Sequence, residues 1–314
     1  MKINRNSKIF LAGHNGMLGQ SILRILKKKG YKKIITINKS NLDLRNQNKI
    51  EKFFKKSKPD VVLIAAAKVG GIKANMKFPV EFIKDNLQIQ TNIISSSYEQ
   101  KVRKLILFGS SCIFPSNIKK PIKEKQLMSG NLEKTNESYA IAKLAGVQMI
   151  KAYNHQFGTD YICLMPCNLF GPNDNYDLNN SHFIPALIRK IFISSNKKIK
   201  SVKLWGTGKP MREVLYVDEV AKACEFFMRK KTSQTVINIG SDTEMSISEY
   251  ANIIKNKIDP SISIRFDKNK EIDGVKRKKL DISLAKKFGW KSKMNFNLVL
   301  DKTIEDYKKN YLEK

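Results

Sequence analysis

Cysteine and histidine are scarce in this 314-residue sequence, which has four of the first and three of the second. A disulfide framework or a structural zinc site requires several such residues at characteristic spacings. No two cysteines form a CxxC pair, and no histidine cluster accompanies them. We therefore predict no metal site and no disulfide framework, and expect any cysteine with a role to act as a single thiol. The four are Cys112, Cys163, Cys167 and Cys224.

The sequence also lacks long apolar runs. Residues 1–7 are polar and basic, and the apolar run that follows is broken by Gly13. A membrane-spanning helix needs about 20 consecutive apolar residues, and a signal peptide needs an uninterrupted hydrophobic region. We therefore expect a cytoplasmic protein.

Acidic residues are few, with 28 Asp and Glu against 59 Lys and Arg, for a formal net charge of +31. Such an excess can mark nucleic-acid binding. The lysines are spread over most expected helices and loops, however, and form only short runs such as residues 27–29 and 276–279. We favour a generally basic composition over specific nucleic-acid binding, with attraction of anionic substrates as a consequence.

Short apolar runs alternate with amphipathic stretches through the first half of the chain. The strand-like runs are residues 8–12, 34–37, 61–67, 105–108 and 161–165. Helical stretches lie between them, such as 18–29, closed by Gly30, and 49–56, followed by Pro59. Repeated strand–helix–strand units build a parallel sheet covered on both faces. We predict an α/β fold with a Rossmann-type, doubly wound parallel sheet.

The rhythm changes after Gly171 and Pro172. An Asn-rich loop, a helix near 182–193 and short strands follow, the strands at residues 202–205, 236–239 and 262–266. We expect residues 1–170 to form a dinucleotide-binding domain and 171–314 mainly a smaller α/β substrate-binding domain, with some segments returning to the first. Ligands in such folds bind beyond the carboxyl ends of the strands, in the cleft.

A glycine-rich loop stands directly after the first strand and leads into a helix. Its sequence is Gly13-His14-Asn15-Gly16-Met17-Leu18-Gly19. Glycines at this junction allow a tight turn, a close approach of a pyrophosphate and close helix–sheet packing, and the helix start supplies amide donors. The position after a first strand makes the motif a strong indication of a dinucleotide site.

The end of the second strand indicates which dinucleotide binds. A carboxylate there favours the ribose hydroxyl of NAD, and a basic residue favours the phosphate of NADP. The chain has Asn38-Lys39-Ser40, so NADP is favoured, although Lys39 could also be one more solvated lysine. Asp43 is a candidate adenine contact or, alternatively, a helix N-cap.

Tyr139 and Lys143 lie four residues apart, on one face of an expected helix that ends near Phe157. A lysine cation lowers the pKa of a neighbouring phenol, which can then exchange a proton with a sugar carbonyl or hydroxyl. Ser110, at the end of the fourth strand, could hold the substrate oxygen beside that tyrosine. Both are expected at the carboxyl edge of the sheet.

Together these three elements resemble the extended short-chain dehydrogenase/reductase family. The resemblance narrows to the GDP-L-fucose synthases, and it runs from about residue 8 to residue 290. The strings that carry it are AAAKVGGI at 65–72, GSSCIFP at 109–115, MPCNLFGP at 165–172, NSHFIPAL at 180–187 and LWGTGKPMRE at 204–213.

The resemblance implies conversion of GDP-4-keto-6-deoxy-D-mannose to GDP-L-fucose, by epimerisation at C3 and C5 and reduction at C4 with NADPH. It implies Cys112 as base and His182 as acid. An inert buried thiol and a helix-start histidine are the alternatives for these two residues. It also implies a homodimer built on two helices, including the Tyr139 helix.

The resemblance further implies ligand contacts. For the cofactor these are Ala66, Phe108, Gly109, Ser110, Ser111, Lys143, Pro166, Cys167, Asn168, Leu169 and His182. For the GDP-sugar they are Lys190, Trp205, Arg212 and Asp273. Asp273 could equally be a turn aspartate, and Arg189 rather than Lys190 could point inward.

Two positions depart from the family pattern. Asn15 stands where relatives often carry Arg, which places more weight on Lys39 for the 2′-phosphate, and Phe114 replaces a common Tyr. Rival functions are a related GDP-4-keto-sugar epimerase-reductase acting on a dideoxy sugar or heptose, an NAD-dependent 4-epimerase, and a non-catalytic nucleotide- or RNA-binding protein. The Cys112 and His182 pair argues against a plain 4-epimerase.

Overall fold

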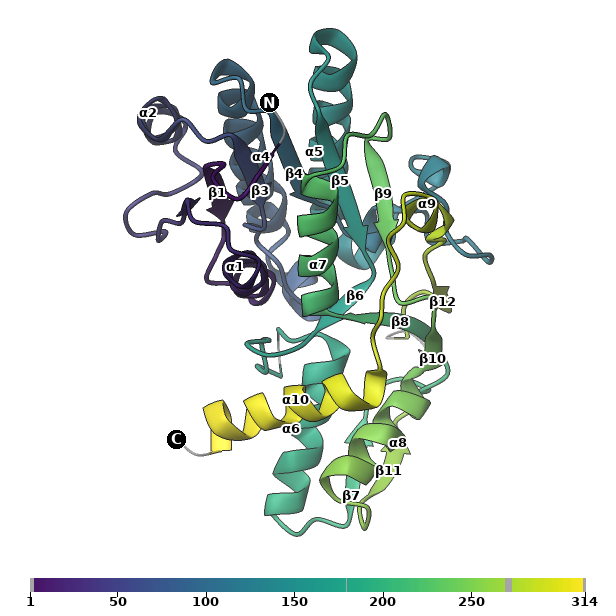
Figure 1. The fold of residues 1–314 in the computed structure, drawn as a ribbon. Coiled ribbons are helices and arrows are strands. Elements are labelled where there is room, and N and C mark those ends of the chain that lie inside the picture. Colours follow the sequence, from purple (N-terminus) through teal and green to yellow (C-terminus); the bar gives the residue numbers. More distant parts are fainter. Residues whose placement is uncertain (1–2, 179, 269–272, 313–314) are drawn as a thin grey trace.

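The computed structural model describes residues 3–178, 180–268 and 273–312. Its centre is a six-stranded parallel sheet with the order β2-β1-β3-β4-β5-β9 (Figure 1). The strands are β1 (Ile9–Ala12), β2 (Ile34–Ile35), β3 (Val61–Ile64), β4 (Lys104–Phe108), β5 (Tyr161–Pro166) and β9 (Val236–Ile239). This sheet confirms the predicted α/β fold.

Helices cover both faces of the sheet, as expected for a doubly wound fold. α1 packs against α7 on one face, and α4 packs against α5 and α2 on the other (Figure 1). Their bounds are α1 (Met17–Lys28), α2 (Gln47–Ser57), α4 (Pro79–Glu99), α5 (Glu137–Phe157) and α7 (Val217–Met228). Gly30 and Gly158, which have positive φ angles, follow the ends of α1 and α5 as the sequence predicts.

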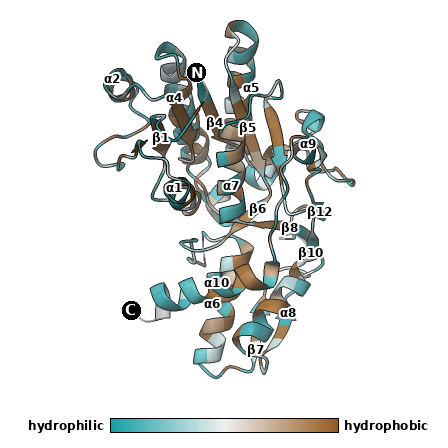
Figure 2. Cartoon of the chain, viewed as in Figure 1, coloured by the Kyte–Doolittle hydropathy of each residue, from teal (hydrophilic) through white to brown (hydrophobic). Residues whose placement is uncertain are grey.

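The core explains why the strands could be recognised in the sequence. Every residue of β1, β3, β4 and β5 is buried, and all except Lys104 at the start of β4 are apolar, so these strands do not alternate. Figure 2 shows the hydrophobic residues concentrated on the sheet and polar residues on the outer helix surfaces. β3 is shorter than predicted, because the chain leaves the sheet after Ile64, where Ala66 contacts the glycine loop.

The C-terminal half forms a second lobe, seen below the main sheet in Figure 1. Its strands are β6 (Asn168–Phe170), β7 (Ser201–Leu204), β8 (Met211–Tyr216), β10 (Glu244–Ser246), β11 (Ser263–Phe266) and β12 (Arg277–Lys278). Its helices are α6 (Phe183–Asn196), α8 (Ile247–Ile258) and α10 (Phe296–Tyr307). They surround a hydrophobic cluster separate from that of the main sheet. β9 lies after residue 170, where the second domain is expected to begin, but it pairs with β5 and so completes the main sheet.

Glu213 in β8 ties the two lobes together. Its buried carboxylate accepts hydrogen bonds from the backbone N–H groups of Leu280 at 2.9 Å and Asp242 at 2.8 Å. Burial raises the pKa of Glu213 from 4.5 to about 7, although these hydrogen bonds oppose the shift. The fold therefore favours the protonated form of this carboxyl group.

This raised pKa makes a prediction for stability. A carboxyl group with a raised pKa in the folded state contributes stability below its unfolded pKa and loses that contribution as pH rises through the folded value. Relative to Glu213→Gln, the wild-type free energy of unfolding should fall by on the order of 3 kcal/mol between pH 4.5 and 7. Urea titrations across this range would measure the difference. Glu99→Gln, at an exposed position, is the control, and a pH-independent difference for Glu213→Gln would contradict the prediction.

Candidate active site

The glycine loop is shaped by close backbone contacts. Gly13 has φ +85°, and a Cβ atom on it would lie 2.5 Å from the backbone nitrogen of Ala66. A Cβ on Gly19 would overlap the carbonyl oxygen of Gly13. A Cβ on Gly16 would meet only that carbonyl oxygen, at 3.7 Å, so open space remains beside Gly16 at the start of α1. This space and the amides of the first helical turn suit a pyrophosphate.

The other residues of this loop differ in exposure. His14 is half-buried, Asn15 is exposed, and Met17 and Leu18 form the first turn of α1. The Asn15 side-chain amide donates to the Asn38 side-chain oxygen at 3.0 Å. This bond joins the glycine loop to the segment that carries Lys39, which is exposed. The structure therefore brings together the two segments expected to select the cofactor.

The Arg45 guanidinium forms an ion pair with the Asp43 carboxylate at 2.7 Å and a second ion pair with the Asp85 carboxylate at 3.1 Å. The hydrogen bonds from Arg45 lower the pKa of Asp43 to about 2. The alternative that Asp43 caps the next helix is wrong, because Asn46 is the N-cap of α2 and accepts from the Lys49 N–H at 3.0 Å.

Lys143 is nearly fully buried and reaches from α5 to the end of β4. Its ammonium group donates to the carbonyl oxygen of Phe108 at 2.8 Å. Gly109 follows, where a Cβ would collide with the Met165 sulfur of the neighbouring strand. Ser110 and Ser111 continue into a short 3-10 helix, with the Ser110 hydroxyl accepting from the Cys112 N–H at 3.3 Å. Ser110 and Lys143 therefore meet at the carboxyl end of β4.

Tyr139 lies beside Ser110, and their side chains share a hydrogen bond. Burial raises the pKa of Tyr139, and the Ser110 bond offsets this only in part. Burial also lowers the pKa of Lys143 to about 8. The structure does not support the expectation that Lys143 lowers the tyrosine pKa, because burial raises this pKa and the Lys143 ammonium group donates to the Phe108 carbonyl instead. Tyr139 is thus protonated at neutral pH and can donate a proton.

Cys112 is half-buried and lies close to both Tyr139 and Arg212. Each of those residues interacts electrostatically with the thiol. The side-chain amide of Asn136 donates to the Cys112 sulfur at 3.6 Å. Sequence reasoning missed Asn136, because a residue directly before a helix suggests an N-cap. The Asn136 side chain makes no cap hydrogen bond, which leaves its amide for the thiol.

His182 stands at the N-cap position of α6, but its side chain does not cap the helix. The preceding segment is bonded to the residue before α3 (Ile72–Lys77), because the Gly71 N–H donates to the Asn180 carbonyl at 3.0 Å. Desolvation by the surrounding protein lowers the pKa of His182, although the residue is exposed. Its protonated form is therefore a stronger acid than a free imidazolium.

The expected contacts at the ends of β5 and β6 lie at the junction of the two lobes. Pro166 ends β5, Cys167 is buried, and Asn168 and Leu169 begin β6. The Asn168 side chain donates to the Glu213 carbonyl at 3.2 Å, which connects this junction to β8.

The four expected substrate residues all belong to the C-terminal lobe. Arg212 is largely buried and donates to the carbonyl oxygens of Met211, Val275 and Asp273, the last at 3.0 Å. The Asp273 carboxylate accepts from both the N–H and the hydroxyl of Thr207, at 2.8 and 2.7 Å.

Asp273 therefore orders the turn that follows Trp205. Trp205 is 47% exposed. The Lys190 ammonium lies 4.2 Å from its ring centroid, whereas the neighbouring Arg189 donates to the Tyr176 carbonyl at 2.8 Å. Lys190 is thus the residue of this pair that lies beside Trp205.

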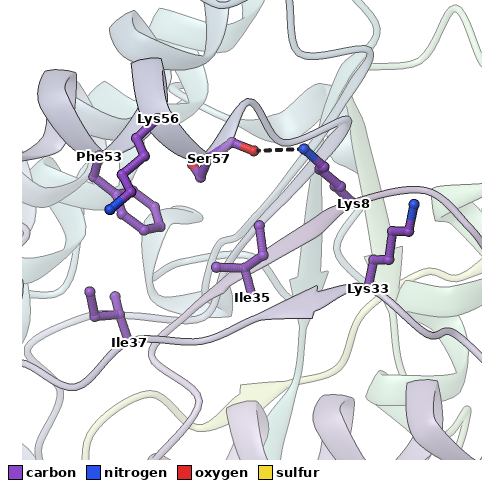
Figure 3. Close-up of a pocket in the computed structure, with 7 residues that line it drawn as sticks. All are labelled: Lys8, Lys33, Ile35, Ile37, Phe53, Lys56 and Ser57. Atoms are coloured by element: carbon purple, nitrogen blue, oxygen red, sulfur yellow. Dashed lines mark hydrogen bonds between the residues drawn. The ribbon is translucent and has the colours of Figure 1, made fainter.

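A pocket of about 500 Å³ lies elsewhere, between β2 and α2 (Figure 3). Its lining contains none of the expected catalytic or ligand-binding residues, and consists of Lys8, Lys33, Ile35, Ile37, Phe53, Lys56 and Ser57. Figure 3 shows the hydrogen bond from the Lys8 ammonium to the Ser57 carbonyl, 3.4 Å long, across this pocket.

Comparison with known proteins shows the family of this chain. The model of the NAD dependent epimerase/dehydratase family matches residues 9–240. This match places the chain in that class of nicotinamide-dependent enzymes. GDP-L-fucose synthase 1 of Arabidopsis thaliana is 43% identical over 307 residues, covering 98% of this chain and 95% of the relative. The Escherichia coli GDP-L-fucose synthase is 38% identical over 312 residues, covering 96% and 97%. The chain belongs to the GDP-L-fucose synthase family.

Solved structures share the whole fold. A Campylobacter jejuni GDP-6-OMe-4-keto-L-xylo-heptose reductase matches with a TM-score of 0.91 and 33% identity, covering 98% of this chain and 99% of that one. A Naegleria fowleri GDP-L-fucose synthetase bound to NADP matches with a TM-score of 0.91 and 28% identity, covering 99% and 96%.

Among the described residues, no helix is long and apolar enough to cross a membrane. Among the same residues, no three His, Cys, Asp or Glu side chains are grouped so as to hold a metal ion.

Proposed function

We propose that this protein converts GDP-4-keto-6-deoxy-D-mannose to GDP-L-fucose with NADPH. The observation that carries the proposal is the combined site: Ser110, Tyr139 and Lys143 gather at the carboxyl end of β4, with the Cys112 thiol beside them. Near-full-length relatives named GDP-L-fucose synthase support the same substrate.

Epimerisation requires a base and an acid on opposite faces of the sugar ring. The 4-keto group acidifies the hydrogens at C3 and C5, so removal of a proton at either carbon gives an enolate that is reprotonated from the other face. We assign Cys112 as the base and His182 as the acid. The Asn136 amide donates to the Cys112 sulfur at 3.6 Å, and Arg212 interacts electrostatically with the same thiol.

Reduction at C4 requires a proton for the developing alkoxide. Tyr139 is protonated at neutral pH and donates this proton, while Ser110 holds the same oxygen by a hydrogen bond. NADPH, when bound, supplies the hydride. Lys143 fixes the backbone at Phe108 and places a positive charge near the reacting oxygen.

The residues present fit NADPH. The open space beside Gly16 and the start of α1 suit the pyrophosphate, and Lys39 suits the 2′-phosphate in place of the absent Arg at position 15. We assign Asp43, which is fixed by Arg45, as the adenine contact. The remaining proposed contacts are His14, Asn15, Met17, Leu18, Ala66, Gly109, Ser111, Pro166, Cys167, Asn168 and Leu169.

For the substrate, Arg212 and Lys190 face its diphosphate, and Trp205 packs against the ligand. Asp273 contributes by ordering the turn at Thr207 and the Arg212 guanidinium. We also propose two domains, 1–170 and mainly 171–314.

We propose a cytoplasmic location and a homodimer through α4 and α5. The homodimer is supported by aromatic side chains that these helices expose. Tyr98 of α4 and Phe157 of α5 are both exposed, and their stacked rings have centroids 4.3 Å apart.

A related GDP-sugar reductase is the second candidate, because the heptose reductase is similar over the full chain. The two functions differ in the sugar that is turned over. Purified protein should oxidise NADPH in the presence of GDP-4-keto-6-deoxy-D-mannose, with GDP-L-fucose as the product identified by NMR. Oxidation only with a 4-keto heptose would favour the second candidate.

A further inference from the structure

Two lysines from different lobes approach the same tryptophan ring. The ammonium nitrogen of Lys190, in α6, lies 4.2 Å from the Trp205 centroid. That of Lys73 lies 3.9 Å from the same centroid. Lys73 belongs to α3 (Ile72–Lys77), which follows the loop after β3 of the main sheet. We call these three residues the Trp205 clamp.

Both sides of the clamp are held in place by hydrogen bonds. The buried Asn75 side chain donates to the carbonyls of Gly70 and Gly71, at 2.9 and 3.0 Å, and so anchors the first turn of α3. On the other side, the Gly206 N–H donates to Asp267 at 2.8 Å. The positions of Lys73 and Trp205 therefore follow from the backbone around them.

The clamp concentrates positive charge at an open surface. Burial and the charge of Lys73 both lower the pKa of Lys190, which shows that the two ammonium groups repel each other, while Asp267 opposes the shift. An anion bound between these two ammonium groups offsets their repulsion, and a diphosphate carries the charge and length to contact both of them.

We propose that Lys73 is a substrate-binding residue that acts with Lys190 on the diphosphate of the nucleotide sugar. Each lobe then contributes one ammonium group to the same ligand, so substrate binding joins the lobes across the cleft. The inference rests on the proposed function for the identity of the ligand. In the sequence, Lys73 is one of many dispersed lysines, and only the fold places it at Trp205.

The test uses GDP, which carries the diphosphate without the reacting sugar. Calorimetry on the full chain with NADP bound would measure the dissociation constant of GDP at low and high salt. Lys73→Gln should weaken GDP binding about tenfold at low salt and less at high salt, because a charged hydrogen bond is lost and salt screens it. Lys73→Arg should restore most of the affinity. Affinity for NADPH and guanosine should not change.

Lys77→Gln is the matched control, since Lys77 is an exposed lysine one turn further along α3. It should leave GDP affinity within about twofold of wild type. If wild type binds GDP and Lys73→Gln binds it equally well, the role of Lys73 is overturned and the proposed function stands. If Lys73→Gln weakens NADPH as much as GDP, the assignment to the substrate diphosphate is wrong. If wild type binds no GDP, the proposed function itself fails.

Discussion

Tyr139→Phe should slow the C4 reduction by about 10²- to 10⁴-fold, the usual contribution of a positioned general acid. The phenol is protonated at neutral pH because burial raises its pKa, and its hydroxyl is bonded to Ser110. Phenylalanine removes the proton donor but keeps the ring. This ring packs edge-on against Phe82, with the two ring centroids 6.1 Å apart. Single-turnover oxidation of NADPH, followed by absorbance, measures this step directly.

Tyr153→Phe is the matched control for this substitution. Tyr153 lies on the same helix, and its hydroxyl bonds Ser95 at 3.4 Å, in contact with α4 rather than with the site. This variant should reduce substrate at the wild-type rate. NADPH affinity should be unchanged in both variants. A Tyr139→Phe enzyme with a normal rate of reduction would show that another group supplies the proton.

Cys112→Ser and His182→Gln should each slow deuterium exchange at C3 and C5 by about 10²-fold or more. A serine hydroxyl loses its proton far less readily than a thiol at neutral pH and so supplies far less of the anionic base, and glutamine cannot deliver a proton as an imidazolium does. Both variants should still bind NADPH, because the glycine loop is untouched. Incubation of the 4-keto sugar in deuterated water, with NADP in place of NADPH, isolates exchange from reduction.

Two variants serve as controls for the exchange experiment. Cys224→Ala removes a buried thiol of α7, and His155→Gln removes an exposed histidine of α5. Both should exchange deuterium at the wild-type rate. Wild-type exchange in Cys112→Ser would remove the thiol from the proposed role, and the same result in His182→Gln would remove the imidazole.

Most of the main sheet was predictable because β1, β3, β4 and β5 are buried along their length and are apolar at nearly every position. The glycine loop and the Tyr139–Lys143 pair were predictable because their spacing is local. β9 was harder to assign, since its pairing with β5 spans about seventy residues of intervening chain. A pairing between strands so far apart in the sequence cannot be predicted from a local sequence pattern.

Other features of the site depend on contacts distant in sequence. The pKa of Tyr139 is set by desolvation, which only the packed structure determines. Asn136 resembles an ordinary helix cap until its amide is seen at the Cys112 sulfur. Lys73 gains its significance only when α3 meets Trp205. Lysine is so common in this chain that its presence at one position carries little information.

We propose a double epimerisation followed by reduction at one site. To test this, the protein is incubated with GDP-4-keto-6-deoxy-D-mannose and NADPH in deuterated water, and the product is examined by NMR. We expect oxidation of NADPH and GDP-L-fucose carrying deuterium at both C3 and C5. Oxidation of NADPH with no deuterium at either carbon would contradict it, because the enzyme would then be a reductase without epimerase activity.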